Sequence, residues 1–150
     1  MIFRSALVSV ALGVGGLGVM LARQAERDMP ITLQLPTHRV RAVVRGTGSP
    51  TVVLEAFGSA PAELWNRISR DVAEFAPVFS YDHAGHWGSE PGPKPRDARQ
   101  IAMELHAALA AAGRRPPYLL VGYSFGGPYT RVFADLYPSD VAGLVLVDPT

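Results

Sequence analysis

The stretch Tyr118-Leu119-Leu120-Val121-Gly122-Tyr123-Ser124-Phe125-Gly126-Gly127 joins an apolar run to a segment with helical periodicity. The run at 118–121 predicts a buried strand, and apolar residues at three- and four-residue spacing after Ser124 predict a helix. Gly122 and Gly126 flank Ser124 where the strand turns sharply into the helix, and glycine suits such a crowded turn because it has no side chain. We therefore expect Ser124 to have strained backbone angles and an outward-pointing hydroxyl, the position of a nucleophile.

Strands and helices alternate along the rest of the chain. Periodicity predicts strands at 51–54, 78–81, 118–121 and 141–147, preceded by an antiparallel pair at 31–35 and 39–45. Helices are predicted at 61–75 and about 97–113, and the first has Leu64, Ile68, Val72 and Phe75 on one face. This order indicates an α/β fold, a mostly parallel sheet with helices on both faces and ligands at the carboxyl ends of its strands.

Composition excludes several classes of function. A chain of 150 residues is long enough for one modest domain. Its net charge is +1, from 14 basic and 13 acidic residues, and no basic run is present, so nucleic acid is not an expected partner. The absence of cysteine excludes disulfides, thiolate metal sites and a cysteine nucleophile.

Residues 5–22 form an uncharged, largely apolar stretch, with Arg4 before it and Arg23 after it. Its length predicts a single transmembrane helix that acts as an uncleaved anchor; a cleaved signal, which would make the protein secreted, and a buried helix are the alternatives. The arginines on the two sides do not determine the orientation. We therefore divide the chain into an anchor or signal with its linker at 1–30 and a folded domain at 31–150.

Three segments resemble the N-terminal half of the α/β-hydrolase fold superfamily, whose serine hydrolases and esterases carry the nucleophile on such a turn. They follow one another at the spacing of that family. The segments are Thr51-Val52-Val53-Leu54-Glu55-Ala56-Phe57-Gly58, Tyr81-Asp82-His83-Ala84-Gly85-His86-Trp87-Gly88-Ser89 and Leu120-Val121-Gly122-Tyr123-Ser124-Phe125-Gly126-Gly127.

The resemblance implies a role for each matching residue. Ser124 would attack an acyl carbonyl, and the backbone N–H groups of Phe57 and Phe125 would stabilise the oxyanion. The implied substrates are small carboxylic esters or related acyl compounds, and the chemistry uses neither a metal nor a cofactor. The chain departs from the family where Glu55-Ala56 replaces the frequent His-Gly and where Tyr123 replaces a frequent histidine. Its Trp87-Gly88 also inverts the usual glycine-then-bulky order.

The general base that Ser124 needs has no good candidate among the four histidines. His83 and His86 fall on the carboxyl edge of the sheet but are expected to be structural or pocket groups. His38, in a strand turn, and His106, in a helix, are expected to be solvated. Asp148, after the sixth strand, is either the acid that orients the base or a loop-capping carboxylate.

Other polar and aromatic side chains have structural interpretations. Asp82 is expected to cap the loop after its strand, and Trp65 and Trp87 are expected to be packing residues rather than parts of a lid. Because the chain stops 26 residues after Ser124, we expect a hydrolase domain truncated after the sixth strand, whose catalytic histidine lies beyond residue 150. Such a chain would be inactive by itself. The alternative is a non-catalytic, membrane-tethered binding module on a hydrolase scaffold.

Overall fold

The computed structural model describes residues 30–150, which are built around a six-stranded sheet. The strand order is β1-β2-β4-β3-β5-β6. β1 pairs with β2, and β2 with β4, in antiparallel fashion, whereas β4, β3, β5 and β6 run parallel, with β3 and β5 side by side. The strands are β1 (Ile31–Gln34), β2 (Arg39–Arg45), β3 (Thr51–Glu55), β4 (Val78–Tyr81), β5 (Tyr118–Tyr123) and β6 (Val141–Val147). The predicted strands and the mostly parallel sheet are confirmed.

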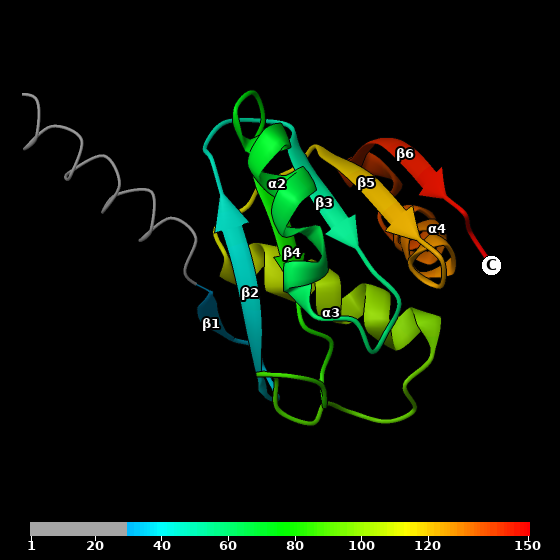
Figure 1. Ribbon diagram of the computed structural model, residues 1–150. Helices are drawn as coiled ribbons and strands as arrows, with labels where there is room; N and C mark the ends of the chain where they lie inside the picture. Colours follow the sequence, from blue (N-terminus) through cyan, green and yellow to red (C-terminus); the bar gives the residue numbers. More distant parts are fainter. Residues whose placement is uncertain (1–29) are drawn as a thin grey trace, which may run out of the picture.

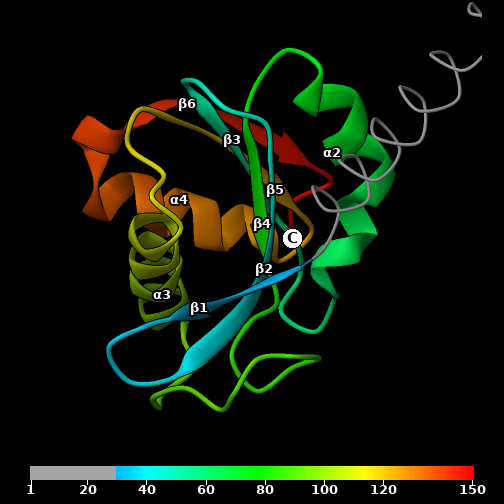
Figure 2. The same cartoon turned by 90° about the vertical axis from the view of Figure 1, so that its left-hand side faces the viewer.

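Helices cover both faces of this sheet, as Figures 1 and 2 show. One face carries the short 3-10 helix η1 (Ala62–Trp65) and the helix α2 (Asn66–Ala73). The other face carries α3 (Ala98–Ala111) and α4 (Gly126–Leu136), and a 3-10 turn, η2 (Pro138–Asp140), leads into β6. The carboxyl ends of β3, β5 and β6 point to the same edge, so the loops that follow them meet there (Figure 1).

The larger core lies between the sheet and the helices α3 and α4. Leu105 of α3 and Phe133 of α4 are fully buried against Phe79 of β4 and Leu120 of β5. The helix α3 begins at Asp97, whose carboxylate accepts a 2.8 Å hydrogen bond from the backbone N–H of Gln100 and so caps the first turn.

The apolar face predicted for the first helix lies mostly outside the core. Leu64, Ile68 and Phe75 are 49%, 48% and 80% exposed, and Val72 alone of that set packs on the core. The reason is local, because the segment begins as the 3-10 helix η1, with three residues per turn, and Trp65 rather than Leu64 faces the sheet. The larger indole buries more apolar surface than a leucine would.

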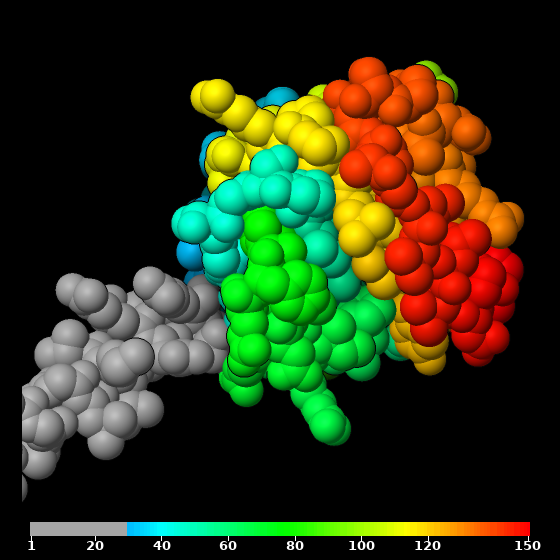
Figure 3. Space-filling view, turned by 90° about the horizontal axis from the view of Figure 1, so that it is seen from above, coloured from blue at the N-terminus to red at the C-terminus, as the bar shows by residue number. Residues whose placement is uncertain are grey.

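The strand β6 lies at the edge of the sheet and pairs only with β5 among the described strands. Leu144, Val145 and Val147 are 38–44% exposed on it. Figure 3 shows this last segment, in red, along one side of the molecule.

No helix within residues 30–150 is long and apolar enough to cross a membrane. The anchor predicted at 5–22 lies outside the described residues.

Candidate active site

Ser124 lies at the turn between β5 and α4, at the carboxyl edge of the sheet. Its φ of 51° is in the left-handed region, which is costly for a residue with a Cβ and persists only where neighbouring contacts hold it. Two hydrogen bonds do so here. The Ser124 N–H donates to the Val147 carbonyl at 3.1 Å, and the Gly127 N–H donates to the Ser124 carbonyl at 2.9 Å. The strained turn expected from the sequence is present.

The glycines around Ser124 allow the start of α4 to lie against the ends of two strands. A Cβ added to Gly122 would come within 2.6 Å of the Gly126 carbonyl oxygen and of Thr130 Oγ1. A Cβ on Gly126 would overlap the carbonyl of Glu55, at the end of β3. The close approach of α4 to both β5 and β3 therefore requires glycine at these two positions.

Phe57 and Phe125 lie on the two loops that this packing brings together. Glu55 is paired with Gly122 in the parallel ladder, so the loop after β3 lies beside the turn after β5. Within residues 30–150, the backbone N–H groups of Phe57 and Phe125 donate to no acceptor of the protein. Both are therefore available to a ligand or a developing oxyanion.

Aromatic rings surround this edge. The Tyr123 ring lies 6.3 Å from the Phe57 ring and 6.3 Å from the Trp65 ring, both in edge-to-face arrangements. Phe125 is largely exposed. Where the family often has a histidine, the chain thus has a tyrosine that packs against the loop after β3.

Sequence reasoning missed the interaction between Glu55 and His83. Both side chains are buried, and His83 Nε2 forms a short hydrogen bond with Glu55 Oε1. Burial alone would lower the pKa of His83, but the charge and hydrogen bond of the Glu55 carboxylate outweigh it and raise this pKa above its usual value. A carboxylate at the end of an otherwise apolar buried strand needs a partner, and that rule could have signalled this pair.

None of the four histidines within the described residues hydrogen-bonds the Ser124 hydroxyl. His86 is exposed near the site. The expectation that His38 is solvated is wrong, because its ring is buried and Nε2 lies 3.1 Å from Glu104 Oε2. For His106 the expectation holds in part, because its side chain is 38% exposed.

The His106 ring stacks on the Tyr137 ring with 3.9 Å between centroids, and its Nε2 lies 3.2 Å from Asp140 Oδ2. This contact explains its partial burial, because a stacked aromatic neighbour covers one face of the imidazole. His106 therefore packs against the C-terminal end of α4.

The two aspartates differ in their surroundings. Asp148 follows β6 directly, is exposed, has a φ of 43°, and makes no side-chain hydrogen bond within residues 30–150. Asp82 is fully buried and accepts hydrogen bonds from the Ala62 N–H at 2.6 Å and from Arg41 at 2.7 Å. The Gly88 N–H, in the loop after β4, donates a 3.5 Å hydrogen bond to Asp82, which agrees with the predicted loop-capping role, and the bond to Ala62 holds the start of η1.

The two tryptophans also differ. Trp65 is buried, as predicted, whereas Trp87 is 67% exposed and donates a 2.9 Å hydrogen bond to the Ser59 carbonyl. Trp87 therefore contributes a surface contact to the Ser59 carbonyl rather than burial in the core, and its backbone has a φ of 51°. In the described part of the chain, no group of His, Asp or Glu side chains is arranged to hold a metal ion.

Comparisons with known proteins place this geometry in a family. A model of the alpha/beta hydrolase fold family matches residues 52–150. The chain is 35% identical to the uncharacterized protein YqjL of Bacillus subtilis over 105 residues, which are 70% of this chain and 42% of that protein. It is 33% identical to lipase LipV of Mycobacterium tuberculosis, over 69% of this chain and 39% of that one. The chain thus spans less than half the length of these relatives.

Solved structures show the same fold. A putative lipase from Acinetobacter baumannii superposes with a TM-score of 0.77 at 19% identity, covering 98% of this chain and 49% of that one. A membrane phospholipase A described as a bacterial virulence factor superposes with a TM-score of 0.75 at 23% identity, covering 93% of this chain and 47% of that one. The family match over 52–150, together with the turn at Ser124, shows that the chain belongs to the α/β-hydrolase fold family.

Proposed function

We propose that this chain forms the nucleophile-bearing part of a membrane-associated serine hydrolase that cleaves carboxylic esters or related acyl substrates. The observation that carries the proposal is Ser124 at a φ of 51°, beside two loops whose Phe57 and Phe125 N–H groups have no acceptor within residues 30–150. The relatives named as a lipase and a phospholipase A support an ester of a small molecule or lipid as the substrate.

In the proposed reaction, Ser124 Oγ attacks the acyl carbonyl and its proton passes to a histidine. The carbonyl electrons move onto oxygen, where the N–H groups of Phe57 and Phe125 stabilise the charge. Collapse of the tetrahedral intermediate expels the alcohol, which takes the proton, and water then releases the acid from the acyl-enzyme. We assign the histidine to sequence beyond residue 150, and Asp148, at the same sheet edge, is the candidate for the acid that orients it.

A fluorophosphonate probe tests the role of Ser124 in the protein expressed from its complete reading frame. We expect one adduct, located on Ser124 by peptide mass spectrometry, and no adduct in Ser124→Ala. Ser139→Ala, on the exposed turn before β6, is the matched control and should react like the wild type. Labelling at another serine, or of the Ser124→Ala variant, would refute the assignment.

The membrane association rests on residues 5–22 and has its own test. We expect the protein to remain in the membrane fraction after extraction with alkaline carbonate. Leu12→Arg places a cation in the middle of the apolar stretch and should reduce insertion, because an arginine at a helix centre costs about 2.5 to 3.5 kcal/mol. Release of the unchanged protein by carbonate would refute the anchor and favour a cleaved signal and a secreted protein.

A non-catalytic binding module is the second candidate, and the observation in its favour is that no described histidine contacts the Ser124 hydroxyl. The same observation supports the related proposal that the 150-residue chain is inactive by itself, because a serine nucleophile needs a base. Hydrolysis of a short nitrophenyl ester by that chain, lost in Ser124→Ala, would refute the proposed inactivity. No hydrolysis by the complete protein would favour the binding module.

A further inference from the structure

We propose that the buried pair of Glu55 and His83 positions the backbone N–H of Phe57 for the oxyanion, and that the proton on His83 thereby controls the rate of acyl transfer. This proposal rests on the proposed function of Ser124. It assigns a positioning role to two residues that need not touch the substrate, at the point where the chain departs from the family's His-Gly pattern.

The His83 ring contacts the segment that carries Phe57 at both ends. Its Nε2 bonds the carboxylate of Glu55, the last residue of β3. A Cβ added to Gly58 would lie 3.4 Å from His83 Nδ1, so the other side of the ring lies against Gly58. Phe57 stands between Glu55 and Gly58 in the chain, and the imidazole therefore braces the segment on both sides of it.

Glu55 depends on His83 for its side-chain partner. Its Oε1 is bonded to the imidazole, whereas Oε2 is buried without a hydrogen bond. Loss of the imidazole would leave a buried carboxylate unpaired, which is strongly unfavourable. Relief would require the end of β3 to move toward water, and Phe57 would move with it, because it follows Glu55 by two residues.

The groups that face His83 determine the effect of its proton. Tyr81 of β4 and Tyr129 of α4 lie with their rings 5.0 and 5.6 Å from the imidazole, and both phenols have a pKa raised chiefly by burial. Glu104 of α3 raises the pKa of His83 and Arg96 lowers it, but these two pair with each other at 2.7 Å. When His83 is protonated, each of the two carboxylates has one cation beside it: His83 beside Glu55, and Arg96 beside Glu104.

A small cavity of about 180 Å³ adjoins the pair. Its lining includes His83, the exposed His86, Arg96 and Tyr129. The cavity offers room for a side chain larger than imidazole at position 83. Arginine there would keep a cation beside Glu55 at every pH at which the protein is folded.

The direction of the pH effect follows from the raised pKa of His83. The stabilisation by the charged pair is complete below the pKa of an unfolded histidine, about 6.5, and is lost as the pH rises through the higher value in the folded protein. The position of Phe57 should therefore loosen as the pH rises through the raised pKa of His83. A variant with arginine at 83 should not show this loss.

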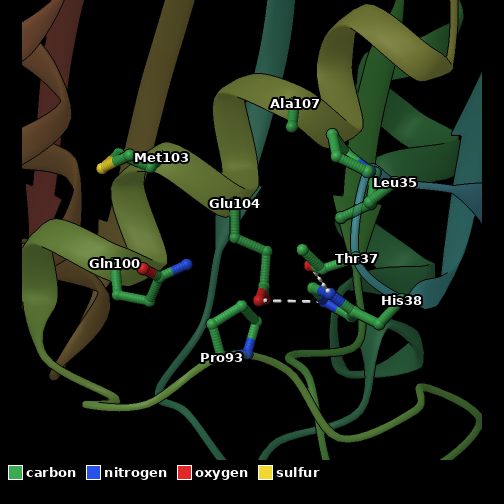
Figure 4. A pocket seen from close by; sticks show the side chains of 9 residues that line it. Leu35, Thr37, His38, Pro93, Gln100, Met103, Glu104 and Ala107 are labelled. Carbon is green, nitrogen blue, oxygen red and sulfur yellow. Dashed lines mark hydrogen bonds and ion pairs between the residues drawn. The ribbon is translucent and has the colours of Figure 1, made fainter.

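The chain offers a matched control in a second buried pair of histidine and carboxylate. His38 lies in another pocket of about 220 Å³, with Nε2 3.1 Å from Glu104 and Nδ1 2.9 Å from Thr37 Oγ1 (Figure 4). Its burial resembles that of His83, at 5% side-chain exposure for each. His38→Gln should therefore disturb the fold comparably but leave the loop at Phe57 in place.

The experiment uses the protein from its complete reading frame and compares His83→Gln, His83→Arg and His38→Gln with the wild type. We expect His83→Gln to lower kcat for a nitrophenyl ester at least tenfold with KM within threefold, because a displaced oxyanion donor acts in the transition state. His83→Arg should restore kcat to within about threefold and remove the decline of kcat that the wild type shows as the pH rises through the pKa of His83. His38→Gln should retain kcat within about twofold.

Hydrogen exchange measured by mass spectrometry adds a readout that does not require activity. The peptide that contains Phe57 should exchange at least tenfold faster in His83→Gln than in His38→Gln. Equal exchange in these two variants would overturn the positioning role even if Ser124 reacts with fluorophosphonate. So would a decline of kcat with rising pH in His83→Arg that is identical to the decline in the wild type. If Ser124 does not react, the proposed function fails, and the exchange rates alone decide whether His83 positions Phe57.

Discussion

Gly126 tests whether the contact between α4 and the end of β3 builds the active site. In Gly126→Ala, the new methyl group would overlap the Glu55 carbonyl oxygen and lie 2.9 Å from its carbon and 3.2 Å from the Ala56 oxygen. All three atoms belong to the backbone, so no side-chain rotation can relieve the overlap. The start of α4 and the loop that carries Phe57 must move apart.

The expected magnitude has two parts. Forcing an extra carbon into a packed site destabilises the fold by about 1 to 3 kcal/mol. Replacing glycine by alanine in a helix stabilises it by about 0.5 to 1 kcal/mol. We therefore expect the free energy of unfolding to fall by about 1 kcal/mol, and by no more than about 2.5 kcal/mol. Displacing one oxyanion donor typically reduces the rate by 10²- to 10³-fold, so fluorophosphonate labelling of Ser124 should slow by about that factor.

The assays are urea unfolding and the time course of labelling in the protein from its complete reading frame. Gly143→Ala in β6 is the matched control, since its Cβ would meet only the Cδ1 atom of Leu119, at 3.0 Å, and a flexible side-chain tip can yield. Wild-type labelling by Gly126→Ala would refute the argument that this contact positions the oxyanion donors. Equal destabilisation by both substitutions would refute the backbone overlap as its cause.

Two further predictions concern stability. Glu104→Gln should lower the free energy of unfolding by about 3 kcal/mol in a urea titration, because the buried carboxylate bonds Arg96 and the Ala84 N–H and lies beside His38. Glu90→Gln is the control, since Glu90 forms an exposed pair with Arg39, and it should have a much smaller effect. A larger loss of stability in Glu90→Gln than in Glu104→Gln would contradict this account. Trp65→Ala should lower the free energy of unfolding by about 3 to 5 kcal/mol and Trp87→Ala by less than about 1 kcal/mol, because only the first indole is buried. Thermal unfolding measures both variants, and equal decreases in Tm would refute burial as the cause of the difference.

Much of the architecture could be predicted from local pattern. The buried run at 51–54 and the turn glycines at 122 and 126 act within a few residues, so the strands, the sharp turn at Ser124 and the mostly parallel sheet follow from them. The helix α3 was equally predictable, because Asp97 supplies its cap and its apolar residues keep the helical period.

The sequence did not reveal which helix face is buried or which polar groups meet. Leu64 and Trp65 are neighbours in the chain, and only the 3-10 geometry of η1 makes Trp65 the one that faces the sheet. His38 and His83 both follow strands or turns, yet each is buried beside a carboxylate far away in the sequence. Such pairs depend on how strands are ordered in the sheet, which periodicity does not encode.

The sequence by itself determined that the chain has a hydrolase-type turn with Ser124 at its apex, because glycine placement and strand-to-helix periodicity are local properties. The tertiary structure decided what surrounds that serine. Pairing of β3 with β5 brings the free N–H groups of Phe57 and Phe125 to one edge. Pairing of β3 with β4 places His83, which follows β4, beside Glu55. These groups meet because parallel strands end at the same edge of the sheet, and that adjacency arises only when the strands assemble.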